Sequence, residues 1–340
     1  MAQRFDDQNL QLMGEAFPIA EPVGAYNINT PTFSASDTGV LAYASGNAAV
    51  RQLAWFNRAG TLTERIGPAM PLFDVALSPD QKRAAIQDEN SDIVVVDLAR
   101  AGVPSRLTFS TAIEDMPVWA PDGSRVLFNS AVAGGPDIYA KASTGAGTEE
   151  LVLESGTPKR PTDWSRDGRF ILYESDDQNS RTDLWVLPLF GDRKPQLFLQ
   201  TPFAEQHARL SPDGKWIAYI SDESRTPEVY VQSFPPSGGK WRVSTRGGFT
   251  PRWRSDGNEL FYLAPDRQIM SVEVRGAGTT FQVSTVTALF HAPVDAVSSA
   301  AANRYDVSAD GQRFLINAPV ENTSSEAVTV VVNWTAGLPR

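Results

Sequence analysis

The feature that most constrains this 340-residue chain is a short pattern that recurs seven times: an apolar strand, a turn built around Asp and usually Gly, and a second apolar strand. In such a turn the Asp side chain accepts backbone N–H bonds, and Gly adopts the positive φ that a tight connection needs. We therefore expect the turn aspartates to be structural. The copies are Phe33 to Tyr43, Leu77 to Ile86, Trp119 to Phe128, Trp164 to Tyr173, Leu210 to Tyr219, Trp253 to Tyr262 and Val307 to Ile316.

The spacing of the copies predicts a β-propeller. The turn aspartates follow one another at intervals of 42 to 46 residues, and only the last interval is longer, at 54. A repeat of this length holds four short strands, which is the content of one propeller blade. The prediction is therefore an all-β fold in which residues 1–340 form a single seven-bladed β-propeller domain of four-stranded antiparallel blades. The blades are expected to begin near residues 31, 75, 117, 162, 208, 251 and 305.

The last unit lacks a recognisable outer strand. Its third strand is expected at Val328 to Asn333 (VTVVVN), and little chain follows. Residues 14–20 (GEAFPIA) precede the first unit and belong to none. We predict that this N-terminal strand closes the ring as the outer strand of blade seven, because closure protects an edge that would otherwise be open to aggregation.

Composition argues against several classes of function. A formal net charge of −10 disfavours nucleic acid and anionic membrane surfaces as partners. No 18-residue apolar run occurs, so direct membrane insertion of this chain is not expected. Cysteine is absent, and the two histidines, His207 and His291, do not form a metal-binding pattern. The acidic loop residues lack EF-hand spacing. We expect no cofactor and no metal.

Catalytic motifs are also missing. There is no G-x-S-x-G nucleophile elbow of the kind that accompanies propellers in prolyl-oligopeptidase-like enzymes. A propeller lyase or glycosidase that uses the acids Asp115 and Glu205 stays open, because a carboxylate pair needs only suitable geometry. Trp119, Trp164 and Trp253 occupy one fixed place in the repeat, which predicts packing between blades rather than a carbohydrate platform.

The candidate binding residues lie in the connections from the fourth strand of one blade to the first strand of the next. Topology places these connections around the central funnel, where propellers usually bind small ligands and peptides. Their mixed charge and aromatic content suits a polar peptide, a sugar or a loop of a partner protein, and a solvated rim of salt bridges is the alternative. The residues are Tyr26, Asn27, Phe73, Asp115, Lys159, Arg160, Glu205, His207, Arg246 and Phe249.

Four long stretches carry a specific resemblance: Leu210 to Asp266, Pro161 to Asp177, Asp183 to Glu205 and Val328 to Leu338 (VTVVVNWTAGL). They resemble the C-terminal propeller of bacterial transmembrane serine/threonine kinases, which is built from TolB-like, WD40-like (PD40) repeats. The resemblance implies an extracytoplasmic domain of a membrane-anchored protein whose kinase domain is cytoplasmic. The Gly-rich loop, the VAIK lysine and the HRD and DFG motifs are absent here, so phosphoryl transfer does not carry over.

The implied function is a non-catalytic sensor that binds a ligand or protein through the funnel face. The partner would be an envelope protein, a peptide or a cell-wall-derived ligand, with self-association of the receptor as a further possibility. The alternative is a free TolB-like periplasmic scaffold protein for protein–protein interactions.

Overall fold

The computed structural model describes residues 2–19, 25–27, 30–31, 33–45, 50–100, 102–132, 135–154, 156–176, 181–294, 303–320 and 327–334. The chain divides into two compact units. The larger spans Arg51–Pro319, and the smaller combines Met1–Val50 with Val320–Arg340. This division differs from the single domain expected from the repeats.

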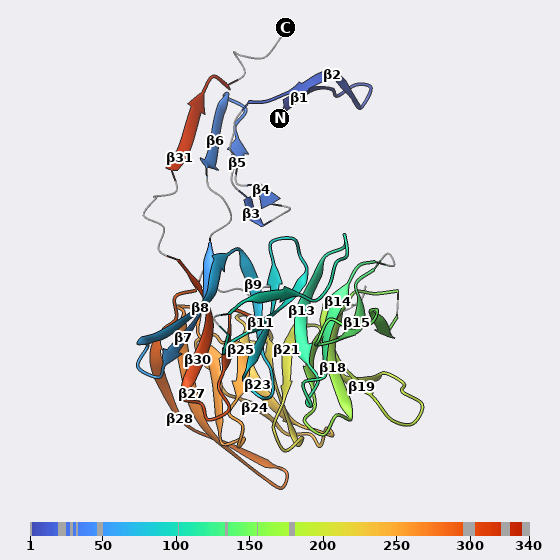
Figure 1. The fold of residues 1–340 in the computed structure, drawn as a ribbon, viewed down its shortest axis with the longest axis vertical. Helices are drawn as coiled ribbons and strands as arrows, with labels where there is room; N and C mark the ends of the chain where they lie inside the picture. Colours follow the sequence, from blue (N-terminus) through green and yellow to red (C-terminus); the bar gives the residue numbers. More distant parts are fainter. Residues whose placement is uncertain are drawn as a thin grey trace. The chain divides into compact units, whose positions relative to one another are not determined.

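The larger unit consists of six four-stranded antiparallel sheets (Figure 1). Five of them follow the chain in order, and the sixth combines strands from both ends of the unit. The sheets are β9 (Leu72–Leu77), β10 (Arg83–Asp88), β11 (Ile93–Asp97) and β12 (Pro104–Arg106); β13 (Glu114–Trp119), β14 (Arg125–Ser130), β15 (Asp137–Ala142) and β16 (Glu150–Leu153); β17 (Lys159–Trp164), β18 (Phe170–Asp176), β19 (Thr182–Pro188) and β20 (Gln196–Leu199); β21 (Glu205–Leu210), β22 (Trp216–Ser221), β23 (Glu228–Ser233) and β24 (Lys240–Arg242); β25 (Phe249–Trp253), β26 (Glu259–Leu263), β27 (Gln268–Ala277) and β28 (Thr280–His291); and β29 (Tyr305–Val307), β30 (Arg313–Pro319), β7 (Arg51–Asn57) and β8 (Leu62–Met70).

The first strands of the six sheets form a closed ring. β9 contacts β13, and the contacts continue through β17, β21, β25 and β29 back to β9. The sixth blade is assembled from both ends of the unit, because β30 pairs with β7 from Arg313↔Asn57 to Pro319↔Arg51. We call the four strands of each blade A to D from the ring outwards.

The smaller unit contains three short sheets. β1 (Ala2–Asp6) and β2 (Gln11–Phe17) form a hairpin, and β3 (Ala25–Asn27) pairs with β4 (Thr30–Pro31). β5 (Phe33–Ala35), β6 (Val40–Ser45) and β31 (Ala327–Val332) form a three-stranded sheet in the order β31-β6-β5.

The strand pairing therefore differs from the predicted one. The described residues form six four-stranded blades, not seven. Most of the segment 14–20 lies in β2, which pairs with β1 and not with the last blade. The seventh repeat takes its third and fourth strands from β7 and β8, and the strand predicted for that place, β31, joins the first repeat. Several strands of similar apolar content compete for these places, and sequence alone does not rank their pairings.

The Asp turns have the structural role predicted for them. In the last repeat, Asp310 accepts hydrogen bonds from Ser308 Oγ (2.6 Å) and from the backbone N–H of Gln312 (3.0 Å). The bond from Ser308 holds the pKa of Asp310 below its usual value. Gly311 follows with φ +70°, which glycine adopts without strain. These bonds order the turn between strands A and B of the last repeat.

The core lies between neighbouring blades, as the tryptophan pattern predicted. Trp119 Nε1 donates to the carbonyl oxygen of Ala76 in the preceding blade (2.9 Å), and Trp253 Nε1 donates to that of Arg209 (3.1 Å). Trp164 differs, since its Nε1 donates to Gly168 in its own turn (3.4 Å). Two of the three indoles therefore connect adjacent blades through a hydrogen bond as well as by packing.

Candidate functional site

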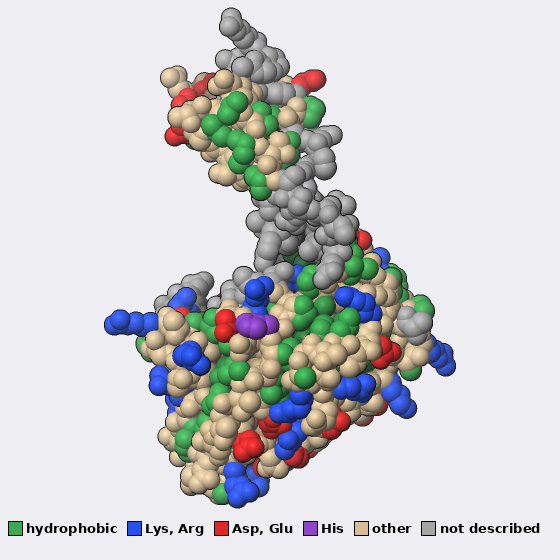
Figure 2. All heavy atoms as spheres, turned by 90° about the vertical axis from the view of Figure 1, so that its left-hand side faces the viewer, with side chains coloured by type: hydrophobic (Ala, Val, Ile, Leu, Met, Phe, Trp, Pro, Cys, Tyr) green, Lys and Arg blue, Asp and Glu red, His purple; other side chains and the backbone are tan. Residues whose placement is uncertain are grey.

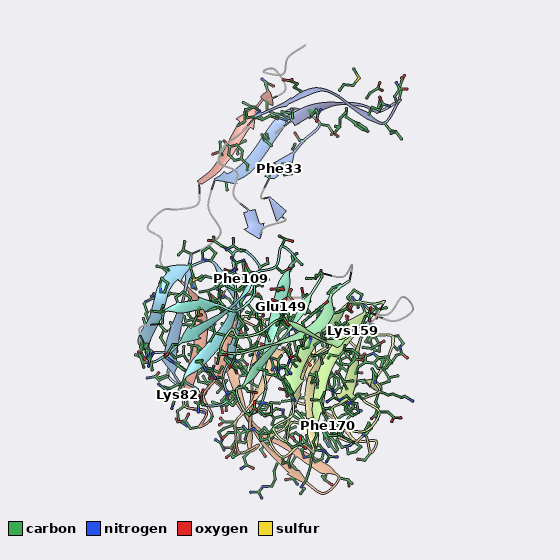
Figure 3. All side chains as sticks on the ribbon, turned by 45° about the vertical axis from the view of Figure 1, so that its right-hand side comes forward. Phe33, Lys82, Phe109, Glu149, Lys159 and Phe170 are labelled. Atoms are coloured by element: carbon green, nitrogen blue, oxygen red, sulfur yellow. The ribbon has the colours of Figure 1, made fainter. Side chains whose placement is uncertain are left out.

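The ring has two ends at which a partner could bind. One end carries the D-to-A connections, where the candidate residues were predicted, and the other carries the A-to-B turns. Figure 3 labels Lys159, the first residue of strand A in the third blade, at one end and Phe170, which follows the A-to-B turn, towards the other.

Two of the predicted residues are internal supports. Lys159 and Glu205 are the first residues of β17 and β21, and they are only 5% and 0% exposed. Glu205 accepts hydrogen bonds from the hydroxyls of Thr201 and Ser221, and burial raises its pKa to about 7. Lys159 Nζ donates to the carbonyl oxygen of Thr157 (3.2 Å). Burial and these hydrogen bonds hold both side chains at the start of strand A.

Phe249 and His207 are also buried. Phe249 packs in the core between the fourth and fifth blades with residues such as Val229 and Tyr262. His207 has φ +56°, and its backbone N–H donates to Glu174 Oε1 (2.5 Å). Both residues belong to the framework around the channel.

Tyr26 and Asn27 lie in β3 of the smaller unit, so they are not part of the propeller's D-to-A connections. The structure does not describe their side chains. The convergence of these two residues with the others at one funnel stays a prediction.

Asp115 and Arg160 come together near the channel, and the structure adds three acids that were not among the candidate residues. Arg160 pairs with Asp176 (2.8 Å) and with the buried Glu174 (3.6 Å). Asp74, which is 2% exposed, accepts the backbone N–H of Asn303 (2.7 Å). We call Asp74, Asp115, Arg160, Glu174 and Asp176 the entrance cluster.

The geometry of strand A directs Asp115 into this cluster. β13 contains an irregularity between Asp115 and Val118, where Met116 has φ +53°, and such a bulge re-aims the neighbouring side chains. Burial, with a further contribution from Asp74, raises the pKa of Asp115 to about 7, and Arg160 opposes that rise. One carboxyl oxygen of Asp115 is buried without a hydrogen-bond partner. The position of this bulge could not be read from the sequence.

Phe73 and Arg246 complete the predicted set. Phe73 is partly exposed, and the guanidinium of Arg304 lies over its ring at 5.9 Å from the centroid. Arg246 is exposed in the connection before β25. Of the ten predicted residues, the D-to-A end therefore offers four to a partner. They are Phe73, Asp115, Arg160 and Arg246.

The opposite end contains a pocket of about 590 Å³ that the sequence reasoning missed. We call it the turn-side pocket, because its walls are the last residues of the A strands and the turns that follow. Charged residues of four consecutive blades line it, each four positions before a turn aspartate, and this common offset is the sequence signal that could have revealed them. They are Asp163, Arg209, Arg252 and Asp306, and Trp119, Trp164 and Trp253 stand beside them.

Ion pairs and hydrogen bonds between blades hold the charged side chains of the turn-side pocket in place. Asp163 pairs with Arg209 (3.7 Å), and Asp306 pairs with Arg252 (3.4 Å). Asp163 also accepts the backbone N–H of Leu210 in the next blade (2.7 Å). Burial, helped by neighbouring Arg252, lowers the pKa of Arg209 to about 10. These residues hold neighbouring blades in register around the channel.

The closed ring of four-stranded antiparallel sheets defines the class of the protein as a β-propeller. The family model of the TolB beta propeller domain (PD40) matches residues 24–197, slightly more than half of the chain, and the chain belongs to this family. Domains of this family are generally non-catalytic binding domains.

Solved structures agree on the fold. A protein from Agrobacterium tumefaciens described as a TolB is 17% identical with a TM-score of 0.63, and the match covers 81% of this chain and 100% of that one. TolB from Acinetobacter baumannii is 18% identical with a TM-score of 0.55, covering 81% of this chain and 65% of that one. Hydrazine synthase from Kuenenia stuttgartiensis is 14% identical with a TM-score of 0.56, and the match covers 88% of this chain and 94% of that one.

Two further observations bear on the kind of site. In the described part of the chain, no three His, Cys, Asp or Glu side chains are grouped so that they could hold a metal ion. No helix in the ranges given above is long and apolar enough to cross a membrane.

Proposed function

We propose that the propeller is the extracytoplasmic sensor domain of a bacterial receptor-type serine/threonine kinase, and that it binds a protein or peptide through its D-to-A end. The observation that carries this proposal is the gathering of Asp115 and Arg160 with Asp74 at the inner ends of three neighbouring blades. Family membership supports a binding role. The kinase and its membrane span rest on the resemblance of the long stretches quoted above.

The chemistry of the entrance cluster favours a polar partner with charges of both signs. Arg160 already has two acidic neighbours, so an incoming carboxylate must compete with Asp176 for it. Arg246 is exposed and can meet an acidic group of the partner directly. Phe73 adds a partly exposed aromatic face close to Arg304. A peptide, a protein loop or a muropeptide would present suitable groups.

A thermal-shift panel of defined peptides and peptidoglycan fragments tests the proposal, because a compound that binds only the folded state raises Tm. We expect a compound that raises Tm to do so much less with Arg246→Ala. The matched control is Arg100→Ala, which removes an exposed arginine from the connection between β11 and β12. A panel in which no compound raises Tm, or an equal loss in both variants, would count against ligand sensing at this end.

The alternative is a free TolB-like scaffold protein, which the TolB structures among the matches favour. The two proposals predict different segments in the gene that encodes these residues. A kinase domain followed by a membrane span, encoded upstream of the propeller, supports the sensor. A cleavable signal peptide without a kinase domain supports the scaffold.

The lyase or glycosidase hypothesis loses its proposed acid pair. Glu205 is fully buried and hydrogen-bonded to Thr201 and Ser221, so it cannot flank a glycosidic bond together with Asp115.

A further inference from the structure

The smaller unit contains an incomplete blade. In the first repeat, the backbone N–H of Ser36 donates to Val40 (2.8 Å) and that of Gly39 to Ser36 (3.1 Å). The third blade of the propeller has two corresponding bonds, from Ser165 to Phe170 (2.9 Å), which spans one residue more, and from Gly168 to Ser165 (2.8 Å). β5 and β6 are therefore strands A and B of a blade, and β31 occupies the place of strand C.

No described residue forms the outer strand of this blade. In each of the six complete blades a fourth strand covers strand C. Among the described residues, β31 pairs with β6 on one side and with no strand on the other. A row of backbone N–H and C=O groups without a neighbouring strand is a template for another strand.

The exposed face of β31 is apolar. Val328, Val330 and Val332 alternate along the strand with exposures of 66%, 58% and 67%. Val330 lies opposite Ala42 and Val332 opposite Val40, so small apolar side chains continue this face onto β6. On the side of the molecule shown in Figure 2, hydrophobic side chains gather on the smaller unit. Contiguous apolar surface of this kind marks an interaction site.

The sequence of β31 is self-complementary. If two copies of the strand pair antiparallel with Val330 opposite Val330, then Val328 of each copy meets Val332 of the other. All three valines stay on one face, and cross-strand pairs of β-branched residues stabilise such a sheet. No charged side chain occurs between Ala327 and Val332, so no like charges oppose each other. The charges and prolines that usually protect an edge are absent from this strand.

We propose that a second copy of this chain covers the incomplete blade, through antiparallel pairing of β31 with β31 of its partner about a two-fold axis centred on Val330. The result is a continuous six-stranded sheet with the valine face extended across both copies. Such a contact is isologous, since the same residues serve both sides. It involves only the smaller unit and is independent of what the propeller binds.

The first test is sedimentation of the full chain over a range of concentrations. We expect the 37.0 kDa chain to form a dimer. Val330→Glu places two carboxylates opposite each other on the axis, and we expect it to weaken the dimer by at least about tenfold. Val132→Glu is the matched control, because Val132 is also exposed (57%) but belongs to the propeller. A wild-type chain that stays monomeric, or equal weakening by both variants, would overturn the proposal.

Cysteine cross-linking tests the register and remains informative if Val330→Glu disturbs the sheet. The chain has no cysteine of its own. Under mild oxidation, Val330→Cys should form a disulfide-linked dimer, because the two sulfur atoms would lie on directly opposite residues. Thr329→Cys, one position away on the other face, should cross-link much more slowly. Equal rates, or no dimer with Val330→Cys, would contradict this pairing.

Discussion

At the residue scale, the propeller depends on carboxylates whose partners lie in the neighbouring blade. Asp163 combines an ion pair with Arg209 and a hydrogen bond from the backbone of Leu210. Asp306 is similar: it accepts the backbone N–H of Leu77 in the following blade (2.8 Å), but its ion pair is with Arg252 of the preceding blade. The same position in different repeats therefore carries out the same inter-blade function.

We expect Asp163→Ala to lower the free energy of unfolding by about 2–3 kcal/mol, because it removes a charged hydrogen-bond acceptor and leaves Arg209 without its counter-charge. Urea unfolding measures this change. Asp192→Ala serves as the control, since its pair with Lys194 is exposed on both sides (82% and 81%) and should change stability by less than about 0.5 kcal/mol. Similar losses in the two variants would show that Asp163 has no inter-blade role.

Buried glutamates make the folded state sensitive to pH. Burial raises the pKa of Glu114 and of Glu205 from 4.5 to about 7. The folded state therefore binds more protons than the unfolded state between about pH 4.5 and 7, so these two groups make stability fall as pH rises through that window. Above about pH 7 both states are ionised, and this contribution stops changing.

The variant Glu205→Gln tests this pH dependence, because glutamine keeps a hydrogen-bonding side chain but does not ionise. Unfolding free energies at pH 5 and pH 7.5 should differ less in the variant than in the wild type. Glu150→Gln is the control at a side chain that is 65% exposed, and it should leave the difference unchanged. An undiminished difference in Glu205→Gln would assign the pH dependence to other groups.

At the scale of the elements, the ring is closed by strands from opposite ends of the larger unit. β7 pairs with β30 along seven residues, and Leu53 and Trp55 of β7 are each only 3% exposed. Trp55 also lies beneath the guanidinium of Arg313, 4.5 Å from the ring centroid. This junction joins the two ends of the unit without a covalent bond.

Two truncated fragments test whether folding of the propeller requires this junction. Residues 51–319 contain all six four-stranded sheets, so we expect this fragment to fold and unfold cooperatively. Residues 72–319 lack β7 and β8, which leaves the edge of β30 uncovered, and we expect aggregation or a loose state. Circular dichroism during thermal unfolding and gel filtration measure both outcomes. A well-folded 72–319 fragment would show that the junction is dispensable.

At the scale of the whole molecule, the two units differ in how completely their sheets are covered. Side chains such as Ile86, Phe128 and Phe261 in the propeller are fully buried between blades. In the smaller unit, Phe33 on β5 and Val330 on β31 are each 58% exposed. Stability follows buried apolar area, so the units should not be equally stable.

Hydrogen exchange should reveal this difference. We expect the amides of β6 and β31 to exchange at least about tenfold faster than those of β10 and β14, because local opening of the three-stranded sheet exposes little new apolar surface. Exchange mass spectrometry at low protein concentration, where self-association is weakest, measures both sets in one sample. Equal protection would indicate that the chain is one cooperative unit.

The sequence by itself determined the local structure of this protein. Turn aspartates such as Asp310, the glycines after them and the period-2 apolar strands are local signals, and they identified every A-to-B hairpin. The fixed place of Trp119 and Trp253 likewise predicted packing between blades. From the candidate site, sequence supplied Asp115 and Arg160, since residues at the start of strand A must lie near the channel.

Only the tertiary structure decided which strands pair at the ends of the chain, and with that the number of blades. β7 (RQLAWFN) and β31 (AVTVVV) are both suitable third strands, and the choice between them depends on packing between residues more than 200 positions apart. Tertiary structure also buried Lys159, Glu205 and Phe249 and opened the turn-side pocket. Burial and long-range pairing are properties of the assembled sheets, and no local pattern encodes them.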